Sequence, residues 1–450
     1  MLRDTFAPRK RSIFMPVSVR RGCFFIACAI FVFPAWAEAP VSPLTWSDCV
    51  RLAARNNPDL HSSLEAMEAS QAQYKGSFNG IFPHLTASNS YTDSSSTSHS
   101  AILPDGTVGT ATTESKLWNL QGTASLDLID FGQWANIQSF AAASRQAQAN
   151  LQVASTTLLL NLYKAFAAVL YAQEEINVDT NIRDTWQANS QMISLRYDSG
   201  AESKGNKMNT QASLLQAEAG LAQAGRDRQV AQQQLSQVLG MDEFSALAVT
   251  GTWSAPAVPD PAPQFDALLA NVPQLRAEQA VVDQARAALK SAHSTLWPTL
   301  SLNYSKGAEG SSEFPTDPFW TFTGVVNYPL FGGGPTSTYY ASQAAERSYE
   351  KAQQDFRSLR NQTLSNLQSA WSSYAQAEDN VRVQRAFLDA AKQRKDESDI
   401  NYQSGLMTFE NWIIVVNDYV NFQTSFLRAE QNLILAEAQW RFTIGEQLGD

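Results

Sequence analysis

Cysteine and histidine are scarce in this chain of 450 residues, which has three of the first and four of the second. Cys23 and Cys28 precede the cleavage site predicted below, so Cys49 alone is expected in the mature protein and no intramolecular disulfide is possible. The histidines are scattered, at positions 61, 84, 99 and 293, without the spacing typical of metal ligands. No set of titratable residues converges on a catalytic pattern. We therefore expect no metal site, no cofactor and no enzymatic activity.

Phosphate-binding motifs are also lacking. The segment "GAESKGNK" is close to a phosphate loop, but Asn206 stands where lysine should follow the glycine, and no strand precedes it. We interpret this segment as a turn between helices.

Basic residues are fewer than acidic residues. Residues 1–37 carry six Lys/Arg and one Asp, so the mature chain has 33 − 6 = 27 basic and 43 − 1 = 42 acidic residues and a net charge of −15. This balance argues against nucleic acid as a partner. It favours, weakly, a channel wall that attracts cations.

Long apolar runs are confined to the N-terminus. Basic residues precede "GCFFIACAIFVFPAWA", and the triplet Ala35-Trp36-Ala37 fits a cleavage site. We predict a signal peptide at residues 1–37, with Met1 or Met15 as its start; too few apolar residues precede Cys28 for a lipoprotein signal. We expect nothing after residue 37 to be long and apolar enough for a transmembrane helix, so entry into a membrane would require a β-barrel.

The chain contains an internal duplication. Asn57–Tyr91 resembles Val272–Lys306, and two prolines have the same separation in each (83 − 58 = 298 − 273). Matching glycines recur in the same order, as Gly132, Gly200 and Gly240 and then as Gly332, Gly405 and Gly445. We predict one structural repeat at residues 38–240, a second at 273–450, and a linker at 241–272.

Two stretches, 133–199 and 336–404, contain no proline or glycine and are rich in good helix formers. They predict helices at 132–198 and 333–403, each about 100 Å long at 1.5 Å per residue. Shorter helices are predicted at 206–240 and 406–445. Small residues recur at steps of four and three from Ala147 to Ala172, which is typical of coiled coils whose helices approach closely.

Amphipathic strands fill the gaps between helices. "LWNLQGTASLDL" (Leu117–Leu128) alternates apolar and polar residues, and hairpins are predicted at about 84–129 and 299–330. The polar face is expected to line a wet lumen with Asn119, Gln121, Thr123, Ser125 and Asp127. The apolar face is expected to meet lipid with Trp118, Leu120, Leu126, Trp320 and Phe322.

Four strands cannot close a barrel. Two copies would give eight strands around a filled interior, whereas three would give twelve with room for water. We favour three copies over two, and over a soluble sandwich, because the strand pairs are too few for a sandwich and lack covering partners. The predicted fold class is mainly α: long antiparallel coiled-coil helices with four strands per protomer, internally duplicated, and a trimer that forms a twelve-stranded membrane β-barrel.

These features together resemble the TolC family of outer-membrane efflux proteins, over nearly all of residues 44–449. "DFG" and "LFGGG" at the strand-to-helix joints and "YDSG" and "YQSG" at the helix turns carry the resemblance. It implies a homotrimer in the outer membrane of a Gram-negative bacterium, with a helical tunnel across the periplasm. An equatorial belt is implied at residues 44–56, 241–272 and the extreme C-terminus.

The family's periplasmic tip narrows where a Tyr-x-x-Gly-x-Arg segment precedes two acidic residues. Tyr402 and Gly405 match, but Met407 stands at the arginine position, and Asn411 and Ile414 stand at the acidic positions. The family's charged latch is therefore not supported, and we predict a tip that closes by packing and hydrogen bonds rather than by ion pairs.

Other charged residues near the tip are possible substitutes for the latch: Glu410, Lys204 and Lys207. In the first repeat the acidic position falls on Asn206. The candidates for the gate and the adaptor contact are Tyr197, Gly200, Asn206, Tyr402, Gly405, Glu410 and Asn411.

The resemblance implies the outer-membrane channel of a tripartite efflux pump. Its expected partners are a periplasmic adaptor, an inner-membrane transporter of the RND or ABC type, and outer-membrane lipid. One alternative is the exit duct of a type I protein secretion system, and another is a periplasmic coiled-coil scaffold outside the membrane. A general porin is contradicted by the long helical stretches. The sequence does not name the cargo.

Overall fold

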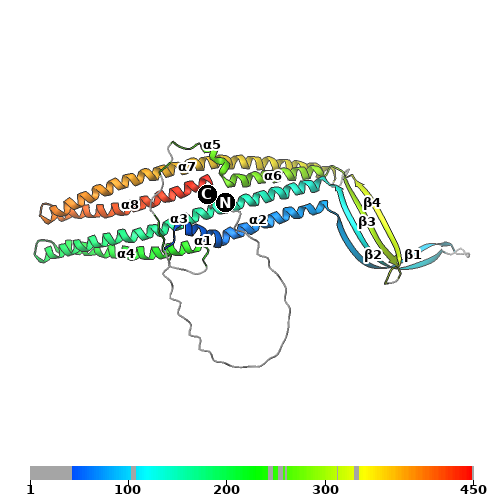
Figure 1. Ribbon diagram of the computed structural model, residues 1–450, viewed down its shortest axis with the longest axis horizontal. Helices are drawn as coiled ribbons and strands as arrows, with labels where there is room; N and C mark the ends of the chain where they lie inside the picture. Colours follow the sequence, from blue (N-terminus) through cyan, green and yellow to red (C-terminus); the bar gives the residue numbers. More distant parts are fainter. Residues whose placement is uncertain are drawn as a thin grey trace, which may run out of the picture. The chain divides into compact units, whose positions relative to one another are not determined.

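The computed structural model describes residues 43–102, 108–241, 247–251, 257–258, 261–311, 313–328 and 334–447. The predicted signal peptide lies outside them. Figure 1 shows the elements, which in chain order are α1 (Trp46–Asn56), α2 (Pro58–Ser77), η1 (Phe78–Ile81), β1 (His84–Ile102), β2 (Val108–Ile129), α3 (Phe131–Asp198), α4 (Lys204–Val238), α5 (Phe265–Leu268), η2 (Leu269–Asn271), α6 (Pro273–Ser294), β3 (Thr299–Gly310), β4 (Asp317–Asn327), α7 (Pro335–Gln403) and α8 (Phe409–Ile444).

The chain divides into two compact units, which we name by their content. The helical unit comprises the described residues up to Pro58, those between Ser155 and Pro263, and those from Leu367 onward. The sheet unit comprises Asp59–Ala154 and Gln264–Asn366 and contains all four strands. Helices α3 and α7 contribute residues to both units.

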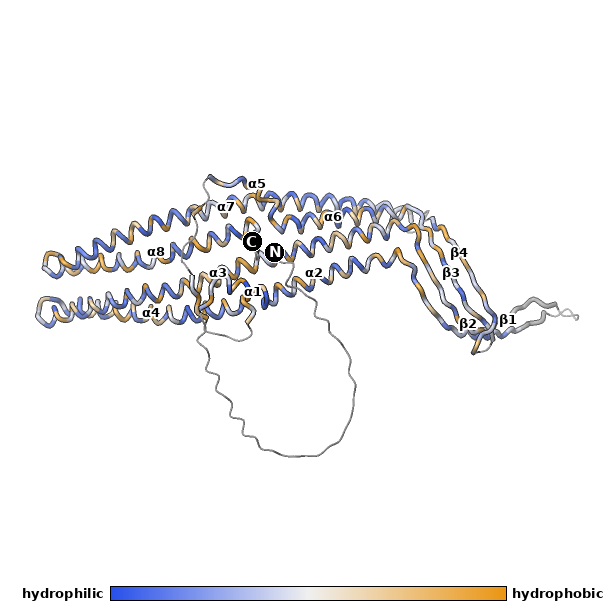
Figure 2. The backbone as a smooth tube through the Cα atoms, in the orientation of Figure 1, coloured by the Kyte–Doolittle hydropathy of each residue, from blue (hydrophilic) through white to orange (hydrophobic). Residues whose placement is uncertain are grey.

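The predicted fold class is confirmed as a mainly helical chain with four antiparallel strands. The strands form one sheet in the order β1-β2-β3-β4, so the two hairpins are joined by pairing between β2 and β3. Trp118 of β2 lies opposite Gly310 of β3, and Leu126 lies opposite Leu302. Figure 2 shows hydrophobic and hydrophilic positions interspersed along helices and strands.

Helices α3 and α7 begin and end at residues that suit helix termini. The Asp130 carboxylate accepts the backbone N–H of Gln133 at 3.1 Å at the start of α3, while α7 begins at Pro335. Gly200 and Gly405 follow the two helices with φ of 75° and 76°, the left-handed conformation that glycine adopts without a steric cost.

One expectation about apolar segments is wrong. Among the described residues, α3 is long and apolar enough to cross a membrane by length and composition. Leu158, Leu162 and Val169 are nevertheless buried within the helical unit. The core helix of a folded domain passes the same test, so length and composition alone do not make α3 a spanning helix.

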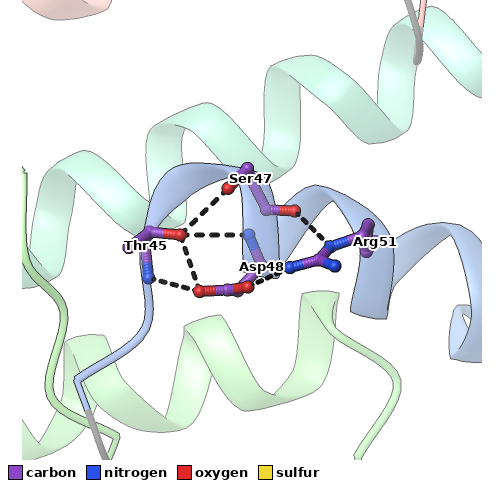
Figure 3. A network of polar contacts seen from close by, with 4 residues as sticks. All are labelled: Thr45, Ser47, Asp48 and Arg51. Atoms are coloured by element: carbon purple, nitrogen blue, oxygen red, sulfur yellow. Dashed lines mark hydrogen bonds and ion pairs between the residues drawn. The ribbon is translucent and has the colours of Figure 1, made fainter.

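Helix α1 is anchored within the predicted equatorial belt. Its N-cap Thr45 accepts the backbone N–H of Asp48 at 3.3 Å, and the Asp48 carboxylate accepts the backbone N–H of Thr45 at 3.2 Å (Figure 3). Arg51 donates to Asp48 and, at 3.4 Å, to the carbonyl oxygen of Ser47 (Figure 3). The neighbouring Leu44 forms a parallel bridge with Val249. Residues far apart in sequence thus meet in the helical unit.

Candidate functional site

The strand register gathers the polar residues of the sheet on one face. The side chains of Asn119, Gln121, Thr123, Ser125 and Asp127 share one face of β2 because alternate residues point the same way. Thr123 lies opposite Thr86 of β1 and Ser305 of β3, and its hydroxyl is 3.2 Å from that of Ser305. Ser125 lies opposite His84 and Asn303. The face is therefore polar across at least three strands.

The opposite face is mainly apolar and largely uncovered, although Asn89 and Lys306 also lie on it. Leu120, Trp320 and Phe322 are 52%, 70% and 60% exposed, and Val326 is 70% exposed. Tyr304 of β3 lies opposite Phe322 of β4, and Leu302 lies opposite Leu126 of β2. Trp118 and Leu126 are half-buried, and Trp118 contacts the ring of Tyr91 with centroids 4.9 Å apart. A large exposed apolar face indicates contact with lipid or with another chain.

Both edges of the sheet are open. Among the described residues, β1 pairs only with β2, and β4 pairs only with β3. Open edges expose unpaired backbone N–H and C=O groups, which need partners wherever water is excluded.

Aromatic residues lie exposed where the strands meet the helices of the sheet unit. Phe131 and Trp297 contact each other with centroids 5.5 Å apart, and each is about half exposed. Trp134, near the start of α3, is exposed to a similar degree. Tyr339 and Tyr340, near the start of α7, contact each other with centroids 5.2 Å apart and are more exposed still. Such a group suits the border between lipid and water, because aromatic rings favour that level of a membrane.

The predicted tip residues lie in two turns of the same construction. After Gly200, the N–H of Ala201 donates to the carbonyl oxygen of Arg196 at 2.8 Å; after Gly405, the N–H of Leu406 donates to that of Asn401 at 2.8 Å. The N-caps Ser203 and Thr408 then accept the backbone N–H groups of Asn206 and Asn411, at 3.1 and 3.4 Å. Asn206 and Asn411 are therefore equivalent positions in the first turns of α4 and α8.

One hydrogen bond connects the two turns. The Tyr402 hydroxyl, at the end of α7, donates to the carboxylate of Glu202, in the turn between α3 and α4. Glu202 also accepts from Asn206 Nδ2 at 2.7 Å and from the Ser203 N–H at 3.0 Å. Tyr402 is 2% exposed, and the Arg196 guanidinium carbon lies 4.8 Å from its ring centroid. We call Arg196, Glu202, Asp399, Tyr402 and Trp412 the turn cluster.

Burial and hydrogen bonding fix the protonation of this pair. Burial raises the pKa of Tyr402, and the hydrogen bond to Glu202 raises it further, so the phenol stays protonated and donates. Burial also acts to raise the pKa of Glu202, but the hydrogen bonds from Tyr402, Asn206 and Ser203 outweigh it, and the net pKa is lowered. At neutral pH, the pair is a phenol bonded to a carboxylate.

Trp412 packs beneath Tyr402. The two rings are stacked, with centroids 4.7 Å apart and planes 14° apart, and Trp412 is fully buried. Its Nε1–H donates to Asp399 Oδ1 at 2.8 Å, and Lys395 forms an ion pair with Asp399 Oδ2 at 2.7 Å. Tyr402 and Trp412 belong to an apolar cluster whose members come from α3, α7 and α8. The other buried members are Ile182, Trp186, Ile193, Phe409 and Val416.

The other predicted tip residues are more exposed. Tyr197 is half-buried under the Lys207 ammonium, which lies 4.7 Å from the ring centroid and pairs with Asp198 at 3.3 Å. Glu410, Asn411 and Lys204 are exposed. Within the described residues, no ion pair of Glu410 or Lys204 is found.

Sequence reasoning missed Glu202 and Asp399. Glu202 is equivalent to Met407 in the second repeat, because both lie two residues after the turn glycine. Alignment of the two repeats therefore did not indicate a carboxylate at position 202. The partner of Glu202 lies 200 residues away, so no local spacing links the two residues.

The outer membrane efflux protein family matches residues 49–241 and 265–443. The chain belongs to this family. The resemblance to the TolC family, the outer-membrane location with a periplasmic extension, and the function as an outer-membrane efflux or secretion channel are thereby confirmed.

Curated relatives of the chain are named for protease secretion and for metal resistance. The chain is 22% identical over 355 residues to the alkaline protease secretion protein AprF of Pseudomonas aeruginosa, covering 77% of this chain and 73% of the relative. It is 22% identical over 383 residues to the cobalt-zinc-cadmium resistance protein CzcC of Cupriavidus metallidurans, covering 84% of each. The solved outer-membrane channel OprN has a TM-score of 0.79 at 17% identity, covering 89% of this chain and 90% of that one.

Proposed function

We propose that the protein works as a homotrimer whose twelve strands close a barrel in the outer membrane and whose helices continue it as a duct through the periplasm. The observation that carries this proposal is the sheet with one polar face, one exposed apolar face and two open edges. In a trimer, β4 of one subunit would pair with β1 of the next, and the edges would disappear. Cargo would pass outward without chemical change.

The two faces of the sheet support the assignment of lumen and lipid. Asn119, Gln121, Thr123, Ser125 and Asp127 would line the lumen. Trp118, Leu120, Leu126, Trp320 and Phe322 would face lipid. The exposed rings of Phe131, Trp134, Trp297, Tyr339 and Tyr340 would mark the periplasmic border of the bilayer.

The turn cluster would hold the periplasmic end of the duct in its narrow state. The Tyr402–Glu202 hydrogen bond joins the α3–α4 turn to the end of α7, and Trp412 stacking supports Tyr402. We assign Tyr197, Gly200, Asn206, Tyr402, Gly405, Glu410 and Asn411 to the gate and to the surface that an adaptor contacts. Closure by packing and hydrogen bonds remains our prediction for how subunits meet at the tip.

The partners would be a periplasmic adaptor and an inner-membrane transporter of the RND or ABC type. Relatives named for metal resistance and for protease secretion support a duct that is sorted by its transporter. The tripartite efflux pump is our main assignment, and the type I secretion duct is the second. We further propose residues 38–240 and 273–450 as the structural repeats, with residues 241–272 in the equatorial belt.

Single-channel recording tests the proposal. The purified mature protein in a planar bilayer should give small basal conductance, and a variant with Tyr402→Phe and Glu202→Ala should give long, large openings. Asp127→Asn, on the proposed lumen face, should lower cation selectivity, because a lumen carboxylate attracts cations. Absence of discrete conductance from both proteins would contradict the proposal.

A further inference from the structure

A groove of about 600 Å³ lies within the sheet unit, between α3, α6, α7 and η2. Its floor is apolar and buried, with Ala149, Leu269 and Leu275 among its lining residues. Its rim carries Arg145, Arg276 and Arg360, all of which are exposed to solvent. None of its lining residues belongs to the strand faces or to the turn cluster, and neither the lumen nor the gate requires it.

The rim has one more positive than negative charge. Arg145 pairs with Asp283 at 2.9 Å, and Arg360 pairs with Asp266 at 2.9 Å. No ion pair of Arg276 is found in the part of the chain that the structure describes. The whole sequence has a net charge of −10, so this excess runs against the charge of the chain.

The Arg276 guanidinium is held in place by neutral groups. Its Nε and one terminal nitrogen donate to the carbonyl oxygen of Ala270, at 3.3 and 2.9 Å, and the other terminal nitrogen donates to Gln152 Oε1 at 3.4 Å. A guanidinium has five N–H groups, so these three bonds leave about two for a ligand. An arginine that is already oriented loses little freedom when it binds a carboxylate, and two N–H groups match the two oxygens of one carboxylate.

We propose that this groove docks an acidic segment of a periplasmic partner protein, with a carboxylate on Arg276 and an apolar side chain on the floor lined by Leu269 and Leu275. The proposal rests on the proposed function, which places this surface in the periplasm. Apolar contact supplies affinity, while the excess charge selects acidic over basic segments.

Fluorescence anisotropy with a defined probe tests the proposal. The probe is a labelled peptide, Asp-Glu-Leu-Glu-Asp, titrated with the intact mature protein in lipid nanodiscs; the comparison peptide has lysine at each acidic position. We expect saturable binding of the acidic peptide alone, weakened by a rise in salt from about 50 to about 300 mM. Arg276→Gln should weaken binding about tenfold, since it removes a charge-assisted bidentate contact. Arg382→Gln, which removes an exposed arginine of the helical unit, should leave binding unchanged.

Each other outcome overturns the docking proposal. No saturable binding, equal binding of the basic peptide, or equal weakening by Arg276→Gln and Arg382→Gln would each contradict it. If Arg276→Gln instead destabilises the oligomer, the groove is a contact between copies of this chain. Conductance of the Arg276→Gln protein should equal that of the unsubstituted protein, so failure of docking and failure of the channel assignment give different results.

Discussion

The Tyr402 hydroxyl donates to the Glu202 carboxylate, which lies 200 residues earlier in the chain. Tyr402 lies in the last turn of α7 in the second repeat, and Glu202 lies in the turn after α3 in the first. This contact differs from the surface ion pairs of the long helices because its donor is 2% exposed and stacked on a buried tryptophan.

Replacement of Tyr402 by phenylalanine tests the contact while keeping the stacked ring. The loss of one hydrogen bond to a charged group should cost about 1.5–3 kcal/mol. We expect longer spontaneous openings in single-channel records and little change in the far-ultraviolet circular dichroism. Tyr197→Phe is the matched control, because Tyr197 is the equivalent residue of the first repeat and contacts Lys207 through its ring. Equal effects of the two substitutions would contradict the assignment.

The lowered pKa of Glu202 predicts a pH dependence of tip closure. The folded pKa lies below the unfolded reference of 4.5, so the carboxylate stabilises the closed tip above that reference value. This stabilisation should be lost as the pH falls through the folded pKa, below 4.5. Spin labels in the two turns, with their distance measured at several pH values, should report separation on acidification. In the Glu202→Gln protein, the distance between the spin labels should no longer change over the pH range in which Glu202 is protonated.

Trp412→Ala should destabilise the helical unit more than any exposed substitution near the turns. A fully buried tryptophan replaced by alanine typically costs about 3–5 kcal/mol, because a cavity remains. Here the Asp399 carboxylate also loses the indole donor. The measurement is thermal unfolding followed by circular dichroism at 222 nm, a wavelength that follows helix. Leu406→Ala, at a side chain that is 80% exposed, should change stability by less than about 0.5 kcal/mol.

Lysine substitutions at two neighbouring positions of β4 should have different effects, because the two side chains lie on opposite faces of the sheet. Phe322→Lys places a charge on the apolar face and should cost about 2–4 kcal/mol near the middle of a bilayer. Thr323→Lys, on the opposite face of the same strand, should be tolerated and should reduce cation selectivity. The yield of heat-resistant oligomer in the outer-membrane fraction measures the cost. Equal yields would show that the two faces are not lipid and lumen.

The turn glycines differ from helix glycines in their backbone conformation. Gly405 has φ of 76° and open space at the Cβ position, so alanine there would suffer backbone strain alone, about 1–2 kcal/mol. Gly225 lies inside α4, also with open space, and alanine there should stabilise by about 0.5–1 kcal/mol. Opposite shifts in the unfolding temperature are expected for Gly405→Ala and Gly225→Ala.

Local patterns sufficed to predict much of the fold. A period of two in Leu117–Leu128 predicted a strand with two unlike faces, since side chains alternate whatever the strand pairs with. Long stretches without proline or glycine predicted the long helices, because nothing in them interrupts the hydrogen-bonding pattern.

Contacts between distant segments were beyond these patterns. Pairing between β2 and β3 joins segments more than 170 residues apart, as the Thr123–Ser305 contact shows with a separation of 182. Glu202 was missed for the same reason, and the duplication obscured it further because the second repeat has Met407 at that position. The expectation that no later segment is apolar enough to span a membrane was wrong for α3, because burial in a protein core and burial in lipid favour similar residues.

The number of copies tests the central claim most directly, because the duct exists only if neighbouring chains complete the wall. Native mass spectrometry of the mature protein, released from outer membranes in a mild detergent, measures it without any substitution. The account predicts a mass of three chains that falls to one chain on full denaturation. A single chain that remains folded in that detergent would contradict it.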